Sequence, residues 1–211
     1  MILLPERQPE ATRLYLVRHA APAVEAGRCY GALDVGLSDR GREQARLLSE
    51  ALGAAPLAAV YTSPLERARQ TAAEIAIPHG LVPRRRSGLA EIDFGELEGR
   101  PYDEIAATHP DTYAVWMSLP TEVEFPGGER FADFADRVRK SVRNVRLAHE
   151  SEEVALVTHG GPIRVVIADA LAMPTSALFR LDQSFAGLSV IDWVDGHPLL
   201  KLLNARPPAC G

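Results

Sequence analysis

Two histidines in this 211-residue chain each follow a short apolar run and could carry phosphoryl chemistry. His19 comes after the run 14–17 and Arg18, and His159 comes after the run 154–158 and before two glycines. Runs of this length are typical of buried strands, so each histidine is expected where a strand ends and the chain turns. In an open α/β sheet, the carboxyl ends of the strands form the ligand crevice. A nucleophilic imidazole beside an arginine, with a second imidazole nearby, indicates phosphoryl transfer through a phosphohistidine.

Three groups are candidates to hold the phosphate. The forked guanidinium of Arg18 suits phosphate oxygens. Segment 63–66 (Ser-Pro-Leu-Glu) matches a capping box with proline at the first helical position, which predicts a helix start. Arg67 would then lean back toward the positive end of that helix. Segment 160–162 (Gly-Gly-Pro) leads into a further helix after His159, and the N-terminus of that helix would also attract an anion. No helical His-x-x-x-His pair or clustered aspartate motif occurs, so neither a metal site nor a cofactor is predicted.

Alternating strands and helices must position these residues. Strands are predicted at 13–19, 57–61, 81–82, 154–159, 188–194 and 199–203, the last two forming a hairpin around 195–196. Helices are predicted at 39–52 with Ser38 as N-cap, from 64 onward, at 101–119 with a break at Pro110, at 131–149 and at 162–171. This order favours a three-layer α/β/α sandwich with a mostly parallel central sheet. We expect a single domain over 1–211, with 84–129 as a helical and loop insertion capping the active site.

Composition narrows the class of protein. The chain is 46% hydrophobic and 24% charged, which suits a folded domain with a normal core. A net charge of −5 argues against a nucleic acid or an anionic membrane as partner. Two cysteines, Cys29 and Cys210, are too few for a disulfide framework. No signal peptide or long apolar segment is evident, so a cytoplasmic protein is expected; the sequence leaves its oligomeric state open.

Three segments in order resemble the histidine phosphatase superfamily, also called the phosphoglycerate-mutase-like family. They are 16–19 (Leu-Val-Arg-His), 63–72 (Ser-Pro-Leu-Glu-Arg-Ala-Arg-Gln-Thr-Ala) and 157–161 (Val-Thr-His-Gly-Gly). The resemblance covers roughly residues 13–206. Ala20 stands where the family usually has a glycine after the first histidine.

The resemblance implies a role for each candidate. His19 would be the phosphorylated nucleophile, and Arg18, Arg67 and His159 would clamp the phosphoryl oxygens. Glu91, in a segment similar to the acid loop of the family's phosphatase branch, would protonate the leaving oxygen and later take a proton from water.

Two further assignments accompany these roles. Asp93 is the alternative to Glu91 as the general acid. Gly160 and Tyr30 are the further candidates for binding the phosphate or the substrate.

The resulting hypothesis is a metal-independent phosphomonoesterase acting on a small phosphorylated metabolite. Segments 179–183 and 203–206 resemble α-ribazole-5′-phosphate phosphatases of cobalamin assembly, so α-ribazole 5′-phosphate is a candidate substrate. The alternatives are a broad-specificity phosphatase, a phosphoglycerate mutase-like enzyme, a protein-phosphohistidine phosphatase and a module that binds phospho-ligands without turnover. Retention of His19 and Glu91 argues against the last, because binding alone needs neither a nucleophile nor an acid.

Overall fold

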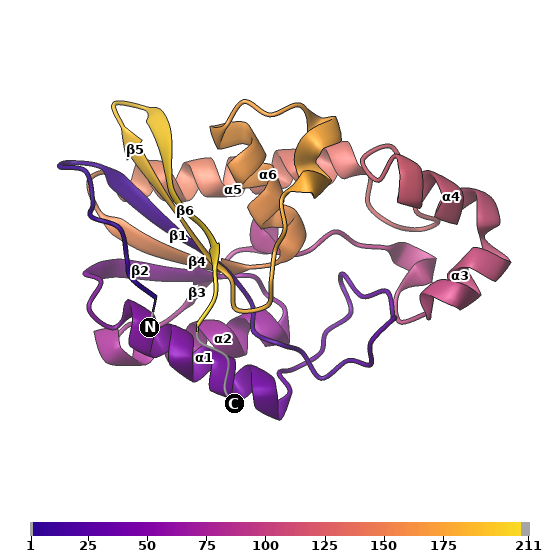
Figure 1. Ribbon diagram of the computed structural model, residues 1–211, viewed down its shortest axis with the longest axis horizontal. Coiled ribbons are helices and arrows are strands. Elements are labelled where there is room, and N and C mark those ends of the chain that lie inside the picture. The colour runs from indigo at the N-terminus through magenta and orange to yellow at the C-terminus, as the bar shows by residue number, and fades with distance from the viewer. Residues whose placement is uncertain (1, 208–211) are drawn as a thin grey trace.

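A six-stranded sheet forms the centre of the computed structural model, which describes residues 2–207 (Figure 1). The strand order is β3-β2-β4-β1-β5-β6, and only β5 runs antiparallel to the others. The strands are β1 (Thr12–Arg18), β2 (Leu57–Thr62), β3 (Arg84–Arg85), β4 (Glu153–Thr158), β5 (Leu188–Val194) and β6 (His197–Ala205). The mostly parallel α/β architecture expected from the sequence is confirmed.

Helices cover both faces of the sheet, and β1 shows why. Its residues alternate, so Leu14 and Leu16 pack into one apolar cluster while Tyr15 and Val17 pack into the other. The first cluster includes residues of α5 (Phe131–Ala148) and α6 (Gly160–Ala170); the second includes residues of α1 (Asp39–Leu52) and α2 (Glu66–Ala76). Two shorter helices, α3 (Tyr102–Thr108) and α4 (Pro110–Ser118), lie beyond the end of the sheet (Figure 1).

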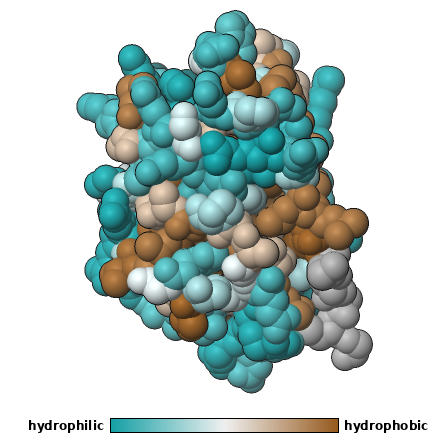
Figure 2. All heavy atoms as spheres, turned by 90° about the vertical axis from the view of Figure 1, so that its left-hand side faces the viewer, coloured by the Kyte–Doolittle hydropathy of each residue, from teal (hydrophilic) through white to brown (hydrophobic). Residues whose placement is uncertain are grey.

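The parallel register brings three strand ends together. Arg18 pairs with Thr158 across β1 and β4, and Thr62 pairs with Val157 across β2 and β4. His19, Ser63 and His159 therefore follow neighbouring strands at one edge of the sheet, on the side of α3 and α4. The opposite side, seen in Figure 2, has a mixed surface on which hydrophilic residues surround a band of apolar ones.

Most predicted elements are confirmed, including the Ser38 cap of α1, the helix break at Pro110 and the β5–β6 hairpin. The strand predicted at 81–82 is wrong: β3 forms at Arg84–Arg85 instead, so the first residues of the predicted 84–129 insertion belong to the sheet. The capping box at 63–66 is also wrong. Helix α2 begins at Glu66, with Leu65 as an N-cap that makes no side-chain hydrogen bond.

The expectations about the two cysteines and about membrane-spanning segments can be compared with the structure only over residues 2–207. Cys29 is a buried free thiol whose pKa burial raises to about 12, whereas Cys210 lies outside the described residues. Within residues 2–207, no helix has the length and apolar character needed to span a bilayer.

A buried ion pair at the amino end of β1 is expected to contribute strongly to stability. Arg13 donates to both carboxylate oxygens of Asp192, at 2.6 and 2.8 Å, and to the carbonyls of Pro5 and Glu6. Replacing Arg13 with methionine would leave the Asp192 charge buried without its partner, at a cost of about 3–5 kcal/mol. Urea unfolding measures this cost. The matched control R139M breaks a half-exposed pair with Asp169 and should cost about 0–1 kcal/mol; equal losses in the two variants would refute the prediction.

Candidate active site

His19 lies buried directly after β1 with one ring nitrogen anchored. Its Nδ1 is 2.8 Å from the carbonyl oxygen of Ala20, which can only accept, so Nδ1 carries the hydrogen. The lone pair of the neutral imidazole is therefore on Nε2, and the Nε–H of Arg67 donates to that atom at 3.3 Å. The fold presents His19 as a neutral nucleophile with a fixed tautomer.

His159 lies fully buried beside it, with ring centroids 5.0 Å apart in an edge-on arrangement. Its Nε2 is hydrogen-bonded to the hydroxyl of Ser63 at 2.7 Å. Its Nδ1 is buried and has no hydrogen-bond partner among the described residues. The serine expected to cap α2 thus orients this imidazole and leaves the other nitrogen for a ligand.

The two arginines are fixed around the histidines by backbone carbonyls. Arg67 is fully buried and donates to Gly31 and Leu33 at 2.6 and 2.7 Å. Arg18 donates through Nη1 to the Gln183 carbonyl at 2.5 Å, whereas its buried Nε is without a partner in the described part of the chain. The guanidinium of Arg18 also stacks 4.1 Å from the ring of Phe185, which in turn lies 5.5 Å from His19.

The two candidate acids differ in position. Glu91 is half-buried, and its Oε2 accepts the backbone N–H of Gly161, at the start of α6, at 3.1 Å. A β-carbon on Gly161 would lie 2.1 Å from Oε1 of Glu91, so only glycine admits this approach. Asp93 is exposed, and its carboxylate instead accepts the N–H of Gly95 at 2.8 Å. The structure brings Glu91 to the histidine cluster and leaves Asp93 outside it.

Tyr30 and Gly160 also lie at this cluster. The Arg67 guanidinium is 5.3 Å from the centre of the half-buried Tyr30 ring. Burial raises the pKa of the Tyr30 hydroxyl despite the neighbouring arginines, so it remains a hydrogen-bond donor at neutral pH. Gly160 is buried, and a β-carbon there would lie within 4 Å of the Arg18 guanidinium.

Sequence reasoning missed four residues that the structure adds to the site. They are Phe185 and Gln183, which follow the 3₁₀ helix Thr175–Arg180, Ser63, and Arg164 of α6. The sequence pattern marks Ser63 only as a helix cap. Gln183 is buried, and both its side-chain nitrogen and oxygen are without partners in residues 2–207, which no sequence signal indicates.

Burial and positive charge should make stability depend on pH. Burial, followed by the charges of Arg67 and Arg18, holds the His19 pKa well below its usual value; burial, His19 and the arginines do the same for His159. The unfolded chain takes up these protons below about pH 6.5 while the folded chain does not. The free energy of unfolding should therefore fall as pH drops through this range, by up to about 1.4 kcal/mol per histidine per pH unit.

Urea unfolding at pH 7.5 and 5.5 measures this slope. His159→Gln should reduce the dependence of the unfolding free energy on pH, because this variant lacks one histidine that takes up a proton only when the chain unfolds. A change in stability at pH 7.5 itself does not affect this comparison. His197→Gln, at an exposed position, should keep the wild-type slope. An H159Q slope equal to that of the wild type would contradict the assignment.

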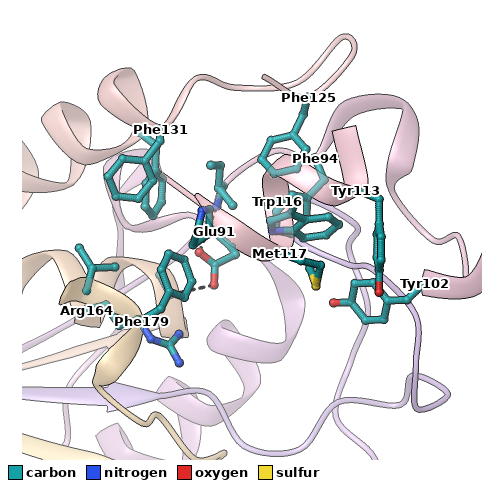
Figure 3. A pocket seen from close by; sticks show the side chains of 15 residues that line it. Glu91, Phe94, Tyr102, Tyr113, Trp116, Met117, Phe125, Phe131, Arg164 and Phe179 are labelled. Carbon is teal, nitrogen blue, oxygen red and sulfur yellow. Dashed lines mark hydrogen bonds between the residues drawn. The ribbon is translucent and has the colours of Figure 1, made fainter. Parts of the chain in front are cut away.

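A cavity of about 540 Å³ opens at Glu91 and Gly161, close in the chain to His159. Figure 3 shows the side chains that line it. Glu91 lies between aromatic residues of the α3–α4 region and a second group formed by Phe131, Phe179 and Arg164. Within residues 2–207, no group of three or more His, Cys, Asp or Glu side chains is placed to hold a metal ion. The positive charge that faces a ligand here comes from the arginines, and the neutral imidazoles of His19 and His159 contribute ring nitrogens.

This chain is similar to several known phosphatases. Phosphoserine phosphatase 1 of Hydrogenobacter thermophilus is 34% identical over 193 residues, covering 91% of this chain and 92% of that protein. The adenosylcobalamin/alpha-ribazole phosphatase of Salmonella typhimurium is 32% identical over 201 residues, covering 92% and 96%. The crystal structure of the alpha-ribazole phosphatase from Shigella flexneri superposes with a TM-score of 0.86 at 27% identity, covering 95% of this chain and all of that one. Residues 14–206 match the family model of the histidine phosphatase superfamily (branch 1), and this chain belongs to that superfamily.

Proposed function

We propose that this protein is a metal-independent phosphomonoesterase that works through a phosphohistidine on a small phosphorylated metabolite. One observation carries the proposal. Two buried nitrogens, Nδ1 of His159 and Nε of Arg18, have no partner in the described residues, and both belong to neighbours of His19: the His159 ring lies 5.0 Å from the His19 ring, and the Arg18 guanidinium stacks on Phe185, whose ring lies 5.5 Å from that of His19. With the Ser63 hydroxyl donating to Nε2 of His159, Nδ1 carries the hydrogen, as Nε of Arg18 does. Leaving such buried N–H donors unpaired costs about 1–3 kcal/mol each, so these positions are built for a ligand that supplies acceptors. A phosphate dianion does so.

The chemistry follows from the positions of the atoms. Nε2 of His19 attacks phosphorus in line, and the bond from phosphorus to the ester oxygen breaks. Protonated Glu91 gives its proton to that oxygen, and the alcohol leaves. Arg18, Arg67 and His159 stabilise the charge on the phosphoryl oxygens. Water then attacks the phosphohistidine, Glu91 takes a proton from it, and inorganic phosphate and free His19 result.

Two guanidiniums supply positive charge that a metal supplies in other phosphatases, so chelation should leave turnover unchanged. We expect kcat/KM for p-nitrophenyl phosphate with excess EDTA to stay within about twofold of its value without EDTA. A loss that added Mg²⁺ or Zn²⁺ restores would refute metal independence.

The names of two relatives described above suggest candidates for the physiological substrate. α-Ribazole 5′-phosphate and phosphoserine are the substrates to compare, each against p-nitrophenyl phosphate. A hundredfold preference for α-ribazole 5′-phosphate, equal to about 2.7 kcal/mol of transition-state binding, would support a place in cobalamin assembly. Similar kcat/KM values for all three would indicate a broad-specificity phosphatase, and no turnover of any would refute the proposed chemistry.

A further inference from the structure

Most of the aromatic residues of the chain line the cavity beside Glu91. The sequence holds two tryptophans, five tyrosines and six phenylalanines, and eight of these side chains line this one cavity. Among the lining residues only Glu91 and Arg164 are charged. The eight are Phe94, Tyr102, Tyr113, Trp116, Phe125, Phe131, Phe134 and Phe179.

The cavity is placed to receive the leaving group. Glu91 and Gly161 line it and are hydrogen-bonded to each other at the start of α6, immediately after His159. An ester whose leaving oxygen is within reach of Glu91 must extend its alcohol away from His19. Glu91 borders a second, polar cavity of about 710 Å³ on the side of Arg86, Arg137 and Lys140, but of the two it is the aromatic cavity that Gly161, two residues after His159, also lines. Figure 3 shows Glu91 between the two groups of side chains that line the aromatic cavity.

We propose that the enzyme selects phosphomonoesters whose alcohol carries a flat, uncharged aromatic ring on a short linker. This inference rests on the proposed function and specifies its substrate class. A ring would bury its faces against aromatic and aliphatic walls. The ammonium and carboxylate of a serine leaving group would lose water and find one opposite charge each, Glu91, which must serve the leaving oxygen, and Arg164, which is already stacked on Phe179.

The ring geometry favours an uncharged group over a cation. Phe125 meets both Phe94 and Trp116 edge-on, at 4.9 and 5.1 Å between ring centres, so these rings pack against one another rather than form an open cage of faces. On the other side of the cavity, the Arg164 guanidinium already lies 5.4 Å from the Phe179 ring. The positive charge of Arg164 would repel a cationic group of a substrate on this side of the cavity.

A series of alkyl phosphates with matched leaving-group chemistry tests the proposal. We expect kcat/KM for 2-(1-naphthyl)ethyl phosphate to exceed that for ethyl phosphate, phosphoserine and choline phosphate by about 100-fold or more. Turnover of all four at similar rates, or a preference for phosphoserine or choline phosphate, would overturn the substrate class and leave the proposed function intact. Failure to hydrolyse any ester would overturn both.

Variants on one helix locate the selectivity. Met117 and Val115 are both exposed on α4, but only Met117 lines the cavity. Met117→Ser should lower the ratio of naphthylethyl to ethyl phosphate turnover about threefold or more, while Val115→Ser should not change it. Equal ratios in the two variants would place the selectivity elsewhere and overturn the proposal.

Binding is also observable without turnover. Trp193→Phe leaves Trp116 as the one tryptophan of the chain. In the W193F/H19Q protein, naphthylethyl phosphate should change the fluorescence of Trp116 with saturation, and ethyl phosphate at the same concentration should not. An unchanged signal at naphthylethyl phosphate concentrations that saturate turnover of the W193F protein would exclude the ring from this cavity.

A separate observation concerns how Glu91 is held. Arg137 of α5 donates to the backbone carbonyls of Ala90 and Glu91, each at 2.9 Å, and to both carboxylate oxygens of Glu129 at 2.6 and 2.8 Å. It therefore joins the acid loop to the turn that ends at Glu129. We infer that Arg137 is a positioning residue for Glu91, an inference that also rests on the proposed function.

Leaving-group dependence distinguishes positioning from a structural role. Arg137→Gln should lower kcat/KM for 2-phenylethyl phosphate about tenfold, because misplacing the acid slows protonation of a poor leaving group. For p-nitrophenyl phosphate, whose phenolate leaves without a proton, the loss should stay within about threefold. Arg139→Gln, on the same helix but paired with Asp169, should resemble the wild type. Equal losses for both substrates in R137Q, or none, would overturn the inference.

Discussion

Replacement of His19 by glutamine is expected to lower kcat by about 10⁴-fold or more for every phosphomonoester. The glutamine side chain keeps much of the shape of the imidazole, but its amide offers no nucleophilic lone pair in place of Nε2. Arg18, Arg67 and His159 are unchanged in this variant, so it should still bind inorganic phosphate. Steady-state kinetics and phosphate binding by calorimetry measure the two properties separately.

Chemical trapping identifies the nucleophile directly. Wild-type enzyme quenched during turnover of a ³²P-labelled ester should carry label on His19, as an N–P bond that is labile in acid and stable in alkali. H19Q should carry none, and His197→Gln, at an exposed histidine, should be labelled like the wild type. Label on any other residue, or near-normal turnover by H19Q, would contradict the phosphohistidine mechanism.

Residues at strand ends could be placed from the sequence because local patterns determine them. The apolar runs before His19 and His159 predicted both strands, and parallel strands bring their carboxyl ends to one edge. Arg67 was expected at the same point. Its contact with His19 is present, but it does not arise from the predicted helix start, since α2 starts at Glu66 and Ser63 does not cap it.

Contacts between distant segments could not be predicted in this way. Ser63 and His159 are 96 residues apart, and their hydrogen bond depends on the register of β2 against β4. The stacking of Phe185 on Arg18 depends on the path of the chain between α6 and β5. Local sequence patterns do not predict such contacts, because the contacts follow from tertiary packing alone.

The sequence alone also could not decide whether Glu91 or Asp93 is the acid, because their tertiary contacts distinguish them. Two residues apart in one loop, they could not be separated by spacing. The structure separates them through their hydrogen-bond partners: the N–H of Gly161, at the start of α6, for Glu91 and the N–H of Gly95, within the loop, for Asp93.

Glu91→Gln should therefore have the second-largest effect, and one that depends on the leaving group. The glutamine oxygen can still accept the Gly161 N–H, so the loop should keep its position while the acid is lost. For 2-phenylethyl phosphate, kcat/KM should fall about 10²–10⁴-fold, because the alkoxide must leave without a proton. For p-nitrophenyl phosphate, kcat/KM should fall by less than about tenfold, because formation of the phosphohistidine needs no acid.

The second half of the reaction gives E91Q a kinetic signature. Without a base to accept a proton from water, hydrolysis of the phosphohistidine becomes slow, so kcat for p-nitrophenyl phosphate should fall far more than kcat/KM. Stopped-flow measurements should then show a burst of nitrophenolate equal to the enzyme concentration. Asp93→Asn should show neither the burst nor the leaving-group dependence. If D93N showed both and E91Q neither, the acid would be Asp93, and the loop would have to turn outward-facing Asp93 toward His19 during turnover.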